Sequence, residues 1–108
     1  MKPIIIALSI GLLAATAYPA NKPRTIEGRI TDYSCGDNCY LTITDSKGAK
    51  HTGLCEAPQC NAWNDRARMP SNQKGKRVTV TVRRGAQRND AGEIMDHMDA
   101  FTRIEYSK

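Results

Sequence analysis

Four cysteines are the residues of this sequence whose type and spacing could most clearly do chemistry. They form two close pairs, Cys35 with Cys39 in the run CGDNC, and Cys55 with Cys60 in the run CEAPQC. Such clusters bind zinc in reducing compartments and form disulfides in oxidising ones. Paired zinc ligands are mostly separated by two residues, whereas these runs place three and four residues between the cysteines. The spacing therefore favours two disulfides over a metal site.

The pairing of the cysteines is left open by the sequence, because four cysteines allow three arrangements. If residues 39–55 form a hairpin, Cys39 lies opposite Cys55 and Cys35 lies near Cys60. The alternative closes each short loop locally, Cys35 with Cys39 and Cys55 with Cys60. We slightly favour the first arrangement, since it constrains more of the unfolded chain. A redox-active role is not favoured, because neither pair is a Cys-x-x-Cys motif at a helix start.

The amino terminus predicts export, which supports the disulfide interpretation. Lys2 precedes an apolar run over residues 4–15, and the sequence ATA at residues 15–17 fits the small-x-small cleavage rule. We therefore expect a signal peptide over residues 1–17 and a protein that is periplasmic or secreted. The apolar run is too short to cross a membrane, so no transmembrane segment is expected after cleavage.

The remaining chain is expected to fold as one domain. Residues 18–24 contain two prolines and are predicted to be a flexible lead-in. Residues 25–108 are too few for more than a single core. We expect this domain to be a monomer.

Catalytic chemistry is poorly represented in this domain. Only two histidines are present, His51 and His97, and no nucleophile elbow, nucleotide-binding glycine loop or His-Glu-x-x-His motif occurs. Aspartates in polar segments are more typical of turn caps than of catalytic groups. We therefore expect no enzyme activity and no cofactor, and any role of the two histidines stays open.

One short run has the residue types of a copper site. Met95, His97 and Met98 lie together, and thioether and imidazole groups suit copper. In a strand, however, Met98 points to the face opposite Met95 and His97, so these side chains do not converge without a bulge. Met98 is more simply a core residue. We assign no metal ligand, and a copper-binding protein remains an alternative.

Charge is unevenly distributed along the domain. The whole chain has a formal net charge of +5, and loss of Lys2 with the signal peptide leaves +4. Six basic side chains and no acidic one lie between Lys74 and Arg88, and four acidic side chains follow between Asp90 and Asp99. The basic part can attract anions, although a solvated basic face beside an acidic one would also account for the pattern.

Hydrophobic periodicity predicts five strands and one short helix. Alternating residues predict strands at 25–33, 39–44, 50–54, 77–83 and 93–106, and a helix at 59–68 with Trp63 as a core anchor. Gly28 permits a bend or a close approach within the first strand. Residues 45–48 form a turn, residues 84–92 a loop, and the phase of Phe101 suggests a bulge near residues 99–100.

The order of these elements predicts the fold class. Three strands, a helix and two strands, β-β-β-α-β-β, is the layout of the five-stranded Greek-key barrel called the OB-fold. A sandwich would need more strands, and a ferredoxin-like fold would need a second helix. We therefore predict an all-β, OB-like barrel with one short helix.

The sequence resembles a group of short exported bacterial proteins of unassigned function. The likeness is carried by CGDNCYL at residues 35–41, LC at 54–55, CNAW at 60–63, GKRVTV at 75–80 and MDAFT at 98–102, and it covers nearly all of the domain. It implies a common fold and export, and no activity. By order of elements alone, the chain is also distantly similar to periplasmic OB-fold proteins associated with stress tolerance.

These observations predict an exported, disulfide-stapled, non-catalytic binding module of the bacterial envelope. OB-folds bind ligands on the face of strands 2 and 3 and on the loops that join strands 1 to 2 and 4 to 5. The candidate ligand-binding residues there are Tyr40, Arg83, Arg84 and Arg88. We expect an anionic ligand or an envelope protein as partner. Nucleic acid is not expected, because the chain is exported and has few aromatic residues. A structural or inhibitor-type envelope protein is a further alternative.

Overall fold

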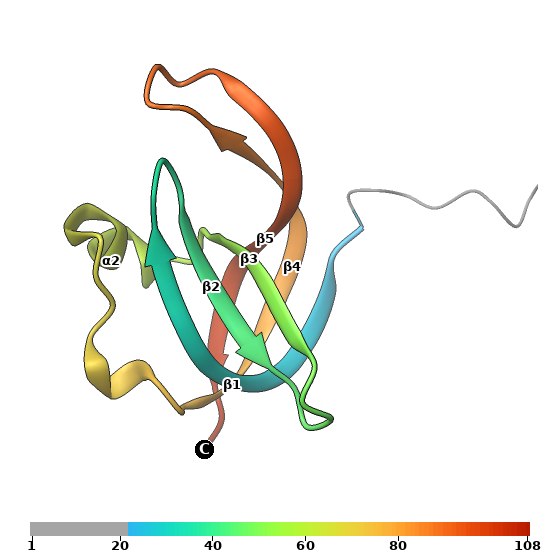
Figure 1. Cartoon of the computed structure of the whole chain (residues 1–108). Coiled ribbons are helices and arrows are strands. Elements are labelled where there is room, and N and C mark those ends of the chain that lie inside the picture. Colours follow the sequence, from blue (N-terminus) through green and yellow to red (C-terminus); the bar gives the residue numbers. More distant parts are fainter. Residues whose placement is uncertain (1–21) are drawn as a thin grey trace, which may run out of the picture.

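The computed structural model describes residues 22–108, a mostly extended chain with one short helix (Figure 1). The predicted signal peptide and most of the predicted lead-in lie outside the described residues. The elements are β1 (Arg24–Cys35), β2 (Cys39–Thr44), β3 (Lys50–Cys55), α2 (Cys60–Arg66), the 3-10 turn η2 (Ser71–Gln73), β4 (Arg77–Arg88) and β5 (Ile94–Tyr106). The predicted order of three strands, one helix and two strands is confirmed.

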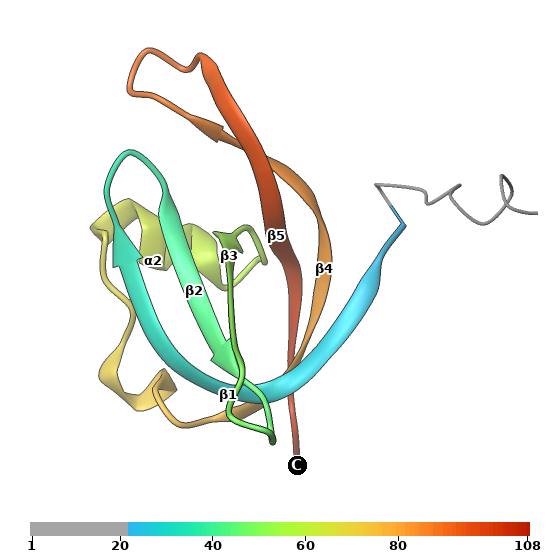
Figure 2. The same cartoon turned by 45° about the vertical axis from the view of Figure 1, so that its right-hand side comes forward.

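The five strands close into a barrel in the order β1-β2-β3-β5-β4. β1, β2 and β3 form an antiparallel meander, β4 and β5 form an antiparallel hairpin, and β4 returns to pair with β1. The barrel is closed on the other side by a short parallel contact between β3 and β5 (Figure 2). This is the predicted OB-like, all-β fold.

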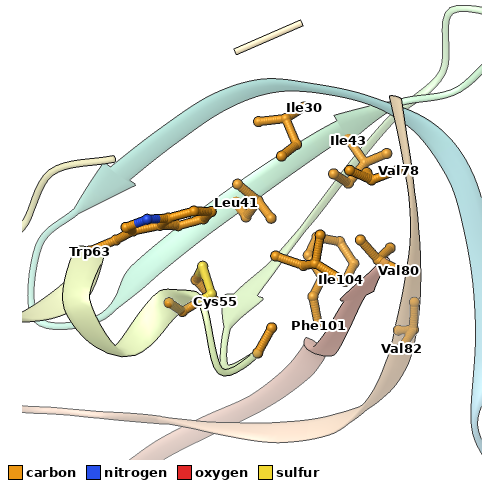
Figure 3. Close-up of a cluster of buried hydrophobic side chains, with 12 residues drawn as sticks. Ile30, Leu41, Ile43, Cys55, Trp63, Val78, Val80, Val82, Phe101 and Ile104 are labelled. Carbon is orange, nitrogen blue, oxygen red and sulfur yellow. A yellow bond between two sulfur atoms is a disulfide. The ribbon is translucent and has the colours of Figure 1, made fainter. Parts of the chain in front are cut away.

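Alternation along the strands builds the core, since every second side chain points into the barrel. Val78, Val80 and Val82 of β4 are fully buried, as the sequence indicates, and they face Ile43 and Phe101 (Figure 3). The other buried members of this cluster are Ile30, Leu41, Cys55, Ala57, Cys60, Trp63 and Ile104. Large aliphatic and aromatic side chains thus fill the interior of the barrel.

β1 pairs with two strands, β4 and β2, because it bends along its length. Its first half pairs with β4 and its second half with β2, with an irregular register between Ile30 and Asp32 that leaves Thr31 unopposed. At the bend, a Cβ atom on Gly28 would lie 2.9 Å from Cγ2 of Ile43 and closer still to the carbonyl oxygen of Thr44. The predicted close approach at Gly28 is therefore confirmed.

α2 packs Cys60 and Trp63 into the core and is shorter than predicted. Trp63 is 5% exposed, and its ring meets that of Tyr33 edge-on at a centroid distance of 6.1 Å. The helix ends at Arg66, because Ala67 adopts a left-handed conformation with φ of 52°. The prediction that Trp63 is a core anchor is confirmed.

The prediction of a loop over residues 84–92 is wrong. β4 continues to Arg88, and the connection to β5 is a turn in which the N–H of Asn89 donates to the carbonyl of Glu93 and Gly92 has φ of 82°. The run RRGAQR lacks apolar alternation, so the sequence does not reveal that β5 pairs with it throughout.

β5 also differs from expectation in its bulge and in one core residue. The register shifts between Thr81 and Val82, so the extra residue is Thr102 rather than a residue near 99–100. Met98, predicted to be core, is only half-buried, because it lies opposite Gly85 beyond the interior cluster.

The two disulfides join Cys35 to Cys39 and Cys55 to Cys60. The crosslinked pairing that we slightly favoured is therefore wrong. The tight turn after β1 places Cys39 directly opposite Cys35, with the Cα atoms 4.0 Å apart. Cys60, at the start of α2, returns to within 5.6 Å of Cys55 between Cα atoms.

Candidate functional site

The turn between β1 and β2 and the hairpin of β4 and β5 meet at one end of the barrel. The hairpin projects beyond the barrel and arches over the β1–β2 turn (Figures 1 and 2). Asn38 joins them: its Nδ2 donates to the carbonyl of Arg88 at 2.9 Å, and its Oδ1 accepts from the N–H of Arg88 at 3.1 Å. The hydroxyl of Tyr40 donates to Oε1 of Gln87 at 2.6 Å. We call residues 83–99 the projecting hairpin.

The turn of the projecting hairpin is held by its own side chains. Oδ1 of Asn89 accepts from the N–H groups of Ala91 and Glu93, at 3.0 and 2.9 Å, in the manner of an Asx turn. The guanidinium of Arg88 donates to the carbonyl of Gly92 at 2.9 Å. These bonds order the tip of the hairpin without help from the barrel.

A small apolar layer outside the core seats the hairpin on the barrel. Leu54 and Ala100 are 3% and 0% exposed, yet they are not part of the interior cluster. They pack where a Cβ atom on Gly85 would lie 2.7 Å from Cβ of Ala100 and 3.0 Å from Cδ1 of Leu54. The absence of a side chain at Gly85 therefore allows the hairpin to lie this close to β3.

The predicted ligand-binding residues all lie at this end, but on two faces of the projecting hairpin. Alternation places Arg83 on the same face as Gln87, whose side chain contacts Tyr40. Arg84 and Arg88 lie on the opposite face. Tyr40 and Arg83 thus lie on one face of the hairpin, with the contact of Tyr40 four positions along β4 from Arg83, and the other two arginines lie on the opposite face.

Little of the positive charge of these arginines is neutralised by acidic side chains. Among residues 22–108, the only ion pair at this end joins Arg24 of β1 to Asp99 of β5 at 2.9 Å. Asp99 also lies opposite Arg84 in the β4–β5 register, so one carboxylate faces two guanidinium groups. Arg83, Arg84 and Arg88 are all exposed.

A hollow of about 360 Å³ opens between the two disulfide loops. Its lining includes Asn38, Leu54, Glu56 and Asn64. Burial raises the pKa of the Glu56 carboxyl. Asn64 of α2 connects β1 to the end of β3, because its Oδ1 accepts from the hydroxyl of Tyr33 at 2.7 Å and its Nδ2 donates to the carbonyl of Cys55 at 2.9 Å. Hydrogen bonds therefore hold the side chain of Asn64 in place in the wall of the hollow.

A second hollow of about 350 Å³ lies at the bend of β1, beside the β2–β3 turn. Gly28, Arg29, Asp45 and Arg77 line it together with smaller polar residues. Asp45 is already engaged: His51 lies 2.8 Å from it through Nε2, and the N–H groups of Lys47 and Ala49 donate to its Oδ1. The hydrogen bond to His51, followed by that from Ala49, lowers the pKa of Asp45. Through these contacts, Asp45 and His51 stabilise the β2–β3 turn.

The residues of the alternative copper site do not converge. His97 lies opposite Ala86 and Met98 lies opposite Gly85, so their side chains leave β5 on opposite faces. Met95 is 64% exposed. No group of three or more His, Cys, Asp or Glu side chains placed to hold a metal ion occurs within residues 22–108.

Sequence reasoning missed Asn38 and Gln87, whose side chains join the β1–β2 hairpin to the projecting hairpin. Polar residues in a turn give no sign of a partner fifty positions away. The only local signal is that Asn38 lies inside the Cys35–Cys39 loop, where a disulfide holds the backbone that presents it.

Comparison with known proteins adds no assignment, because no family model and no curated protein matches the chain. In the part of the chain that the structure describes, no helix has the length and apolar character needed to cross a membrane.

Proposed function

We propose that the protein is an exported, non-catalytic binding module of the bacterial envelope and that its projecting hairpin binds an anionic ligand. The observation that carries this proposal is the set of three exposed arginines on one strand that extends beyond the barrel, Arg83, Arg84 and Arg88. Among residues 22–108, none of the three forms an ion pair with an acidic side chain. Exposed cations that are not neutralised locally attract and retain anions.

The hydrogen bonds around the projecting hairpin support the proposed binding site. Asn38 and Tyr40 hold the hairpin against the β1–β2 turn, and Asn89 orders its tip. A preorganised surface loses little conformational entropy when a ligand binds. The guanidinium groups of the three arginines supply charge and hydrogen-bond donors to an anion.

The test measures binding of two polyanions, inorganic polyphosphate and poly-L-glutamate, by calorimetry at about 0.05 M and about 0.3 M salt. The triple variant R83A/R84A/R88A is expected to lose binding, and binding to the unchanged protein is expected to weaken with salt. The matched control is R66A/R68A/R77A, which removes three exposed arginines elsewhere and changes the net charge equally.

Equal loss in both triple variants would mean that total charge, not the hairpin, attracts the anion. Absence of binding to the unchanged protein at low salt would reject the proposed function. Metal that remains bound through purification would favour the copper-binding alternative, and a stoichiometric protein partner with salt-independent affinity would favour the inhibitor-type alternative.

A further inference from the structure

One edge of the projecting hairpin has no strand beside it among residues 22–108. β1 pairs with β4 only between Arg77 and Val82, whereas β5 pairs with β4 as far as Arg88. Residues 83–87 therefore have a neighbouring strand only on the β5 side. Unpaired strand edges are where extended chains add to a sheet.

Backbone hydrogen bonds at the start of β4 show which residues face this edge. The carbonyl of Lys76 accepts from the N–H of Ile30 in β1, and the carbonyl of Arg77 accepts from the N–H of Ser107 just after β5. Consecutive residues of an antiparallel strand direct their N–H and C=O groups to opposite edges. Even-numbered residues of β4 therefore face the β1 side, which becomes the open edge beyond Val82.

The far end of β4 follows the same alternation. The N–H and C=O of Arg88 are both bonded to Asn38 and face away from β5. Both irregularities in the β4–β5 register place the extra residue on β5, so β4 alternates without interruption. Arg84 and Ala86 lie between the two anchored positions, and their N–H and C=O groups face the open edge.

Asn38 shows the kind of group that this edge accepts. Its carboxamide donates to the carbonyl of Arg88 and accepts from the N–H of the same residue, which is how the N–H and C=O of one residue in an adjacent antiparallel strand would bond. The side chain thus substitutes for one residue of a neighbouring strand, and the next two positions along the edge remain open.

Charge indicates the chemistry of the segment that would fill these positions. Arg83 lies on one face of the hairpin and Arg84 and Arg88 lie on the other, so a chain alongside β4 meets guanidinium groups whichever way its side chains point. β4 contains no acidic residue. Cross-strand pairs of opposite charge stabilise a sheet and pairs of like charge oppose it.

We propose that the open edge of β4, from Arg83 to Gln87, binds an acidic polypeptide segment in extended conformation, which adds to the sheet as a further strand. The backbone of Arg84 and Ala86 supplies the hydrogen bonds, and the side chains of Arg83, Arg84 and Arg88 supply the preference for acidic side chains. This inference rests on the proposed function and names a polypeptide as the class of anion that the hairpin takes.

The test compares three synthetic peptides of equal length: one alternating glutamate and valine, one with lysine in place of glutamate, and one acidic peptide with every backbone amide methylated, so that neither edge of it can donate to β4. The first is expected to bind most tightly, and the lysine peptide is expected not to bind. On binding, the amide protons of Arg84 and Ala86 are expected to become protected from hydrogen exchange. The methylated peptide keeps the charge and loses the strand hydrogen bonds, so its affinity is expected to fall roughly tenfold or more.

A pair of variants tests the same point from the side of the protein. Ala86→Pro removes the N–H from the open edge and leaves every charge and every β4–β5 hydrogen bond in place, so it should weaken the acidic peptide roughly tenfold. Ala86→Val is the matched control, since it keeps the N–H. If Ala86→Pro does not fold, the methylated peptide on the unchanged protein still decides the question.

Three outcomes would overturn strand addition. Equal binding of the acidic peptide and its methylated form would leave a charge-driven anion site and reject the added strand. Binding of polyphosphate but of no acidic peptide would do the same. Protection of Arg84 and Ala86 without peptide would assign the edge to the chain's own amino terminus if it is lost on deletion of residues 18–21, or to a second copy if it rises with protein concentration. If no polyanion binds, the proposed function itself fails.

Discussion

Gly28 is the residue at which closure of the barrel leaves no room for a side chain. β1 crosses from β4 to β2 at this point, and a Cβ atom would meet Ile43 and the backbone of Thr44. Gly28→Ala is expected to lower the free energy of unfolding by about 1–3 kcal/mol, because the neighbouring backbone cannot move without opening a strand pair. Urea denaturation measures the change. Gly36→Ala is the control, since nothing lies within 4 Å of its Cβ position, and an equal loss in both variants would contradict the explanation.

Asp45 makes stability depend on pH through the β2–β3 turn. Its pKa is lowered chiefly by the hydrogen bond to His51 and then by that from Ala49. A carboxyl whose pKa is lower in the folded state stabilises the fold above its unfolded pKa of about 3.9, and this contribution disappears as pH falls through the folded value. Asp45→Asn is expected to be less stable than the unchanged protein at neutral pH, and the two should converge in acid.

Unfolding curves between neutral pH and strong acid check this expectation. Asp65→Asn, at an exposed position of α2, is the matched control for the loss of one carboxylate, and at neutral pH it should be more stable than Asp45→Asn. A stability difference between Asp45→Asn and the unchanged protein that persists unchanged in strong acid would show that the variant acts through something other than the titration of Asp45.

At the level of elements, Asn38 holds the projecting hairpin through the backbone of Arg88. Asn38→Ala leaves these two exposed groups to water, so global stability should change by no more than about 1 kcal/mol. Local opening of the hairpin should become easier, and exchange of the Arg88 amide should quicken roughly tenfold. Asn61→Ala on α2 should leave that amide unchanged. Unaltered exchange in Asn38→Ala would mean that the barrel holds the hairpin without this contact.

The two disulfides differ in their surroundings and should differ in reactivity. Cys55 and Cys60 are 2% and 0% exposed and belong to the core, whereas Cys35 and Cys39 are half-buried at a turn. Thiol–disulfide exchange needs access of the attacking thiolate to a sulfur atom. Brief treatment with a mild reductant and an alkylating agent should therefore label Cys35 and Cys39 first, as peptide mass spectrometry can show. Simultaneous labelling of all four would contradict this order.

For the molecule as a whole, a single core enclosed by all five strands predicts a single unfolding transition. Trp63 joins the helix to the interior cluster, and closure of the barrel ties β1 to β4 and β3 to β5. Small domains with one core unfold in an all-or-none manner. Trp63 fluorescence and far-ultraviolet circular dichroism should therefore give the same denaturation midpoint. Separate midpoints would show that α2 detaches before the barrel opens.

Local patterns were sufficient to predict the architecture from the sequence. The two-residue period of β4 follows from strand geometry, so the alternating valines show directly which face is buried. The polar turn at residues 45–48 and the glycine at 28 likewise depend on neighbours along the chain or on a requirement for space. The number of strands and the place of the helix then pointed to the OB-like barrel.

Other features depend on contacts between distant residues, and only the tertiary structure decided them. The cysteine spacing is compatible with more than one pairing, and the return of α2 to the end of β3 selects Cys55 with Cys60. Residues 84–88 read as a loop, because a strand stabilised by its hydrogen-bonded neighbour needs no apolar alternation of its own. The contact of Asn38 with Arg88 spans fifty positions. Sequence periodicity reports which side chains are buried, and it carries no information on which polar groups of separate turns meet in space.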